Sequence, residues 1–334
     1  MKSLKYMGFA LAAATCMQFA AAQQPAKLSA YVQVPGGKPD LLELERSDGN
    51  GSFFYLQKGT DQLMQTKASA CKMFYIQTPA EMANALRDYY GGDYADARKQ
   101  FASIKKKYAA FAGLPGSPCT MSALYELTCA VRMLDVAAAK TLVGSFPGAS
   151  ALTGADVARL EAAKVFALID DKPESFATIK AGVEEIVKTH GRNLDSESNG
   201  WLRYALARAA ASMVPAEQVQ ATIAEDKAKA ASAAVDFYCQ AVMSMHGAQK
   251  LLPADALNRA MALLWAMPGV QDYAAKVGTP MTKTGWNAAP ADFRDAVAMA
   301  HYLKTVYPSE TPNAFADKLD AYYFNAMKGV KKGE

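Results

Sequence analysis

The spacing of apolar residues along this chain changes once, at Pro79. After Pro79, apolar residues recur every three or four positions, which places them on one face of an α-helix. The clearest of these stripes are Ala97, Phe101, Ile104, Tyr108 and Phe111; Phe176, Ile179, Val183 and Ile186; Val235, Tyr238, Val242 and Met245; and Phe315, Leu319 and Tyr322. The pattern predicts a mostly α fold, with a helical domain over residues 79–330.

Before Pro79, apolar and polar residues alternate instead. The alternation covers residues 28–34, 41–45, 53–57 and 73–77, and glycine-rich turns follow the first two of these runs. A period of two is typical of strands with one buried face. We expect a small antiparallel β-module of about four strands over residues 26–78, packed on the neighbouring helices because so small a sheet is marginally stable alone.

The first helix carries start signals at the boundary between the two regions. Thr78 is placed to cap this helix, Pro79 suits its first position, and Glu81 has the spacing of a capping box. Further along the chain, short breaks such as Gly91-Gly92 and Pro268-Gly269 separate the helical segments. Short connections make consecutive helices antiparallel neighbours, so we expect about ten to twelve helices in consecutive hairpins.

Residues 89–101 read Tyr-Tyr-Gly-Gly-Asp-Tyr-Ala-Asp-Ala-Arg-Lys-Gln-Phe. A helix with tyrosines ends here in a Gly-Asp-Tyr turn, and the next helix offers a small residue, Ala97, and a large aromatic, Phe101. This segment resembles the centre of a tetratricopeptide repeat (TPR). A degenerate copy follows, with Leu134-Asp135-Val136 in place of the turn and Ala139 in the small position. The resemblance implies a right-handed superhelix of TPR-like hairpins behind the β-module, and it implies no activity.

Residues 1–22 have the features of a secretory signal peptide. Two lysines precede a short apolar stretch that ends Ala20-Ala21-Ala22, as a small-residue cleavage site should. We expect cleavage after Ala22 and export to the periplasm or the outer envelope. The alternative is a lipoprotein signal that anchors the chain at Cys16, although Thr15 stands where such signals usually have Gly, Ala or Ser. The stretch is shorter than the roughly 20 residues that a membrane span needs, and we expect no span in the mature chain.

Charge argues against a nucleic-acid partner. The chain has 36 Lys+Arg and 32 Asp+Glu, and removal of the predicted signal with its two lysines leaves 34 against 32. Nucleic-acid-binding proteins normally have a strong basic excess or a basic stripe. The only internal basic run, residues 105–107, fans out around its predicted helix and reads as a solvated face.

Four cysteines remain after the predicted cleavage: Cys71, Cys119, Cys129 and Cys239. Their pairing stays open in an oxidising compartment. Cys119 and Cys129 should not pair with each other, because ten residues of helix separate them by about 15 Å, which is too far for a disulfide.

Motifs that carry catalysis are missing from the sequence. The three histidines, His190, His246 and His301, fall in different hairpins and form no close metal-ligand pair. The glycine-containing segments 36–39 and 113–118 match neither a phosphate loop nor a nucleophile elbow. We therefore predict a protein that is not an enzyme and has no cofactor and no metal.

The expected function is a non-catalytic protein-binding or scaffold protein of the cell envelope. Helical repeats stack into superhelices whose concave side is an extended binding surface. The alternative is a hydrolase or glycan-processing accessory factor whose site is assembled from distant residues, and a third possibility is a purely structural envelope component. An open groove with basic and aromatic residues would favour binding, whereas converging carboxylates or histidines would favour an enzyme.

The hairpin register also suggests where a protein or peptide partner would bind. Residues 82, 85 and 89 of the first hairpin and 124, 127 and 131 of the second should face the core. The adjacent stripe then holds Arg87, Tyr90, Tyr125 and Arg132, which suit an extended peptide because arginine pairs with carboxylates and tyrosine offers rigid contact area. Ordinary surface positions are the alternative for these four residues. A second set, Met243, Met245, Met261 and Met267, either lines an adaptable groove or fills the core.

Overall fold

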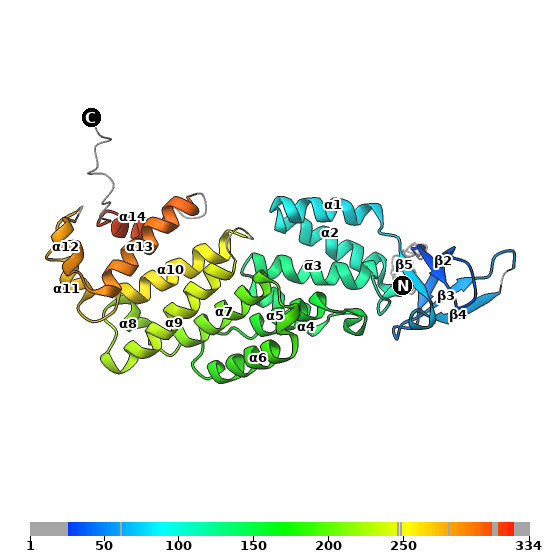
Figure 1. Ribbon diagram of the computed structural model, residues 1–334, viewed down its shortest axis with the longest axis horizontal. Coiled ribbons are helices and arrows are strands. Elements are labelled where there is room, and N and C mark those ends of the chain that lie inside the picture. Colours follow the sequence, from blue (N-terminus) through cyan, green and yellow to red (C-terminus); the bar gives the residue numbers. More distant parts are fainter. Residues whose placement is uncertain are drawn as a thin grey trace, which may run out of the picture.

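A computed structural model describes residues 26–60, 62–245, 247, 249–279, 281–308 and 313–323. Within these residues the chain forms one five-stranded sheet followed by fourteen helices. Figure 1 shows an elongated molecule, with the sheet at one end and the last helices at the other. The predicted signal peptide, including Cys16, lies outside the described residues.

The sheet is antiparallel throughout, in the order β4-β3-β2-β1-β5. Four strands confirm the predicted runs, and the fifth, β4, was not predicted. No residue of β4 is buried, so this edge strand has no apolar face that alternation could reveal. The strands are β1 (Leu28–Gln33), β2 (Asp40–Ser47), β3 (Ser52–Leu56), β4 (Leu63–Lys67) and β5 (Met73–Ile76).

The helices that follow number more than expected because three of them have only five or six residues, too few to show a periodic stripe. These short helices are α8, α11 and α12. The full set is α1 (Ala80–Gly91), α2 (Tyr94–Lys107), α3 (Pro118–Arg132), α4 (Val136–Gly144), α5 (Ala155–Phe166), α6 (Ser175–His190), α7 (Ser196–Ala211), α8 (Ala216–Gln220), α9 (Glu225–Ser244), α10 (Leu251–Trp265), α11 (Val270–Ala274), α12 (Lys283–Ala288), α13 (Ala291–Val306) and α14 (Ala314–Asp320).

The predicted capping box at the start of α1 is wrong. Pro79 is the residue before the first helical turn, and no side chain caps this end. The Glu81 carboxylate instead accepts hydrogen bonds from Lys107 Nζ at 2.5 Å and from the Tyr108 hydroxyl at 2.9 Å. Glu81 therefore joins the start of α1 to the end of α2.

The turns after α1 and α3 have the same backbone geometry. Gly92 and Leu134 are both left-handed, with φ of 90° and 57°, and each is followed by an aspartate that caps the next helix. The backbone N–H of Asp93 donates to Asp88 and that of Asp135 donates to Ala130, both at 2.9 Å. Leu134 thus occupies a conformation that glycine adopts more easily.

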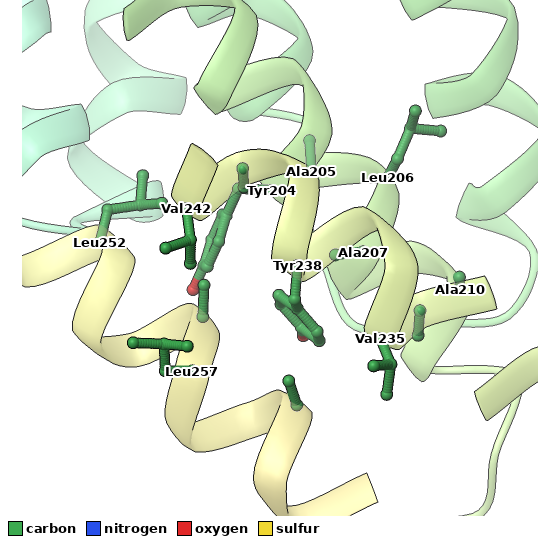
Figure 2. Packing of buried hydrophobic residues seen from close by; sticks show 14 of the residues in the cluster. Tyr204, Ala205, Leu206, Ala207, Ala210, Val235, Tyr238, Val242, Leu252 and Leu257 are labelled. Carbon is green, nitrogen blue, oxygen red and sulfur yellow. The ribbon is translucent and has the colours of Figure 1, made fainter. Parts of the chain in front are cut away.

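Two apolar cores run through the molecule. One joins the inner face of the sheet to α1, α2 and α3, which confirms that the sheet packs on the neighbouring helices. The other extends from α3 to α14. Figure 2 shows part of the second core, where Tyr204 of α7 and Tyr238 of α9 lie among aliphatic side chains beside α10.

The core positions predicted for the first two hairpins are confirmed. Each is at most 5% exposed: Met82, Ala85, Tyr89, Leu124, Leu127 and Val131. Ala97, Phe101 and Ala139, which the TPR resemblance places between helices, are fully buried.

Candidate binding cleft

Arg132, the last residue of α3, forms a buried ion pair with Glu197 in the first turn of α7. Its Nε and Nη2 donate to the two carboxylate oxygens at 2.6 and 2.7 Å. Its guanidinium lies 4.2 Å from the centre of the Tyr89 ring, and Nη1 donates to the Tyr94 hydroxyl at 3.2 Å. Burial alone would lower the pKa of Arg132, but the hydrogen-bonded Glu197 raises it above its ordinary value. The side chain stays charged and ties α1, α2, α3 and α7 together.

A second pair reinforces this junction. Arg159 of α5 donates to the carboxylate of Asp195, which also caps the first turn of α7. Burial favours the neutral form of Asp195, yet the hydrogen bonds from Ser198 and Arg159 hold its pKa below the ordinary value. The start of α7 is therefore fixed by two arginines from earlier helices.

Three of the four predicted groove residues gather around the buried Tyr89. Tyr125 is half-buried, stacks on Phe101 with ring centres 5.1 Å apart and lies edge-on to Tyr89. Tyr90 is 72% exposed and lies edge-on to Tyr89. Arg132 completes the group, because its guanidinium lies over the Tyr89 ring.

Arg87, the fourth predicted groove residue, is exposed to solvent. Its side chain is 74% exposed, and its Nε is 3.6 Å from a carboxylate oxygen of the adjacent Asp88. Arg132, by contrast, is 8% exposed. The ion pair with Glu197 thus buries Arg132, whereas Arg87 stays exposed. A role of the four residues in binding stays a prediction.

A polar cleft of about 620 Å³ opens next to Arg132. It lies between the turn after α1, the end of α3, the segment that leads into α10 and the end of α13. Figure 1 shows the end of α1 facing the start of α10 across this region. The side chains that line the cleft include Tyr94, Arg132, Gln249, Lys250, Leu251, Val306 and Tyr307.

Lys250 is the cation of the cleft lining that could bind a negatively charged ligand, because Arg132 is already paired with Glu197. It is exposed and forms no ion pair with any residue in the described part of the chain. Next to it, Gln249 is 5% exposed; its Nε2 donates to the Met245 sulfur at 3.0 Å, and its Oε1 has no partner among the described residues. The cleft thus combines one free positive charge with tyrosine and amide groups.

The sequence analysis did not find Gln249, Lys250 or Tyr307. These residues reach the cleft from the loop before α10 and from the end of α13, far along the chain from the TPR-like segment. No local pattern marks them, because only the packing of α7, α9 and α10 brings the two parts together.

Groups suited to catalysis are sparse over the described ranges. No cluster of three or more His, Cys, Asp or Glu that could hold a metal occurs among those residues. His190 lies in the last turn of α6, His301 is 2.9 Å from an Asp320 oxygen and stacks on Tyr323, and His246 is outside the described residues.

The four cysteines in the described part of the chain, Cys71, Cys119, Cys129 and Cys239, are free thiols. Cys119 and Cys129 lie on the same helix, α3, as the argument against their pairing requires. Burial raises the pKa of Cys119 to about 11 and that of Cys129 to about 12. These two thiols are therefore protonated at neutral pH and poorly suited to act as nucleophiles.

Comparisons with known proteins give no relative. No family model matches the chain, and searches of curated proteins and of solved structures also find no match. Over the residues that the structure describes, no helix has the length and apolar character needed to cross a membrane.

Proposed function

We propose that this protein is a non-catalytic binding or scaffold protein of the cell envelope that holds an extended, acidic segment of a partner protein in the polar cleft. The observation that carries the proposal is the cleft itself, where Lys250 offers a positive charge that no described residue neutralises.

The chemistry of the lining supports an acidic peptide. Among the described lining residues there is no carboxylate and no histidine, so the charged groups are the two cations, Arg132 and Lys250. Arg132 is already paired with Glu197, which leaves Lys250 to bind a carboxylate of the partner. Tyr94 and Tyr307 add aromatic contact area, and Leu251 and Val306 are exposed apolar residues at the same cleft.

The matching turns after α1 and α3 support a repeat architecture within this proposal. In it, TPR-like hairpins stack into a right-handed superhelix whose concave side contains the cleft. The placement in the envelope rests on the signal-like features of residues 1–22.

The proposal is tested by reversing the free charge with Lys250→Glu. The wild-type protein is used as bait in an envelope extract, the captured protein is identified, and its purified form is titrated against both baits. The affinity of the partner for Lys250→Glu should be at least about tenfold weaker, because a carboxylate of the partner would then face a carboxylate. The wild-type affinity should fall with added salt, because salt screens the attraction between Lys250 and the partner's carboxylate.

Lys188→Glu is the surface control, since Lys188 is an exposed lysine on α6, a helix that contributes no residue to the lining of the cleft. Circular dichroism and thermal melting should be the same for both variants. Equal affinity of the Lys250→Glu and wild-type proteins for the captured partner would contradict the proposal.

A further inference from the structure

A second recess lies on the part of the molecule formed by α9, α10 and α13. Its volume is about 780 Å³, and its lining is mostly apolar. Val242 and Leu257 are buried, and Figure 2 shows them on the adjacent helices α9 and α10. Met299 and Ala298 of α13 contribute further apolar surface.

Met243 stands out at this recess because it is 79% exposed. The other methionines of the set singled out in the sequence, Met245, Met261 and Met267, are at most 4% exposed and fill the core. An exposed, flexible methionine in an apolar recess is typical of surfaces that adapt to apolar partners. The methionine pattern thus divides into three core residues and one surface residue.

Carboxylates lie beside this apolar surface on α9 and α13. Asp295 lines the recess, and Asp236 lies one turn of α9 before Cys239, which also lines it. Asp292 lies one turn before Asp295 on α13. None of the three aspartates forms an ion pair with a residue in the described ranges.

The pKa values of Cys239 and Asp292 are raised in part by neighbouring carboxylates. Burial, with Asp236 and Asp295 adding to it, raises the pKa of Cys239, and burial together with Asp295 raises the pKa of Asp292. The charges that act on these two groups are carboxylates. The recess therefore has an apolar floor and an acidic rim.

We propose that this recess, independent of the polar cleft, docks an amphipathic helix of a partner protein that carries lysine or arginine beside its apolar face. The walls are helices, which have no free backbone groups with which an extended strand could pair, so side-chain packing must supply the contacts. On α13, the lining of the recess extends from Asp295 to Tyr302, which are seven residues apart, or about two helical turns. That length matches apolar anchors spaced three, four and seven residues apart on a docked helix. Exposed aspartates at the rim then meet the basic residues of the partner.

The test uses a designed probe. A labelled peptide of about 18 residues, roughly five helical turns, carries leucine on one face and lysine on the other. A second peptide replaces each lysine with glutamate, and a third scrambles the order so that no apolar face forms. Fluorescence anisotropy should show that the leucine–lysine helix binds the wild-type protein at least about tenfold more tightly than the other two.

Two variants locate the binding. Met243→Ser removes the exposed apolar contact, and the pair Asp236→Asn with Asp295→Asn removes the rim charges. Each should weaken binding of the leucine–lysine peptide about fivefold or more. Val187→Ser and Glu184→Gln, which change exposed residues of α6, are the matched controls and should leave the affinity unchanged.

The results of these experiments distinguish a basic amphipathic helix from other occupants of the recess. Equal binding of the lysine and glutamate peptides, or variants that bind as well as the wild type, would overturn the proposal. Self-association that sedimentation detects and that Met243→Ser abolishes would also overturn it, by assigning the recess to a second copy of the chain. Lys250→Glu should not affect peptide binding, so failure here and failure of the proposed function are distinguishable.

Discussion

Arg132 is a charged residue that is buried together with its ion-pair partner, Glu197. Its side chain and that of Glu197 are each 10% exposed. Removal of one partner from such a pair leaves a buried charge without compensation, which costs far more than the loss of a surface ion pair. Arg132 therefore serves the junction of α3 and α7, and a mutation there cannot report on binding alone.

We expect Arg132→Ala to lower the free energy of unfolding by about 3–5 kcal/mol, because Glu197 would remain buried without a cation. Urea denaturation at neutral pH measures the change. The double variant Arg132→Met with Glu197→Met should recover most of the loss, since it replaces the pair with apolar side chains of similar length. A loss below about 1 kcal/mol for the single variant would mean that the ion pair is solvated.

Among the elements, the β2–β3 turn and the loop before α3 meet at their backbones. Gly113 has a φ of 84°, and a Cβ on it would lie 2.2 Å from the carbonyl oxygen of Gly49 in that turn. The Ser47 hydroxyl also donates to the carbonyl of Ala112 at 2.7 Å. The sheet is thus seated on the helical region through a contact that only glycine permits.

We predict that Gly113→Ala weakens this contact and costs more than about 2 kcal/mol, because both the left-handed backbone and the close approach oppose a side chain. Gly116→Ala is the matched control: its φ is 71°, but no atom lies within 4 Å of the added Cβ. The control should show only the backbone strain of about 1 kcal/mol. Urea melts with limited proteolysis of the sheet provide the measurement, and equal effects of the two variants would show that the contact does not matter.

The whole molecule should lose stability in alkali through its buried thiols. In the folded protein the pKa of Cys119 is about 11 and that of Cys129 about 12, against an ordinary value of 9.0. A raised folded pKa gives stability that is fully present below about pH 9 and is lost as the pH rises toward the folded pKa, since only the unfolded thiols ionise in that window.

Above pH 9, each thiol should lower the free energy of unfolding by an amount that approaches about 1.4 kcal/mol per pH unit. Urea titrations under reducing conditions at several pH values between 7 and about 10.5 measure the slope. Cys119→Ala with Cys129→Ala should flatten the slope even if the double variant is less stable at pH 7. An unchanged slope would assign the alkaline loss to other groups, such as Tyr204, whose pKa burial raises to about 12.

The sequence by itself determined the elements whose signals are local. The change of period at Pro79 separated the sheet from the helices, and the stripes identified core residues such as Tyr89 and Phe101, because burial of one face fixes the apolar spacing. Edge strand β4 and the shortest helices escaped because they bury too little to show a period.

The tertiary structure alone decided which charged residues are exposed and which distant residues meet. Arg87 and Arg132 were predicted to share one stripe, yet only Arg132 pairs with a carboxylate of α7 and is buried. Lys250 reaches the polar cleft, and Asp236 and Asp295 come together at the apolar recess, through the packing of helices far apart in the chain. Periodicity reports which face of a helix is buried, but the identity of the neighbour depends on long-range packing that no local spacing encodes.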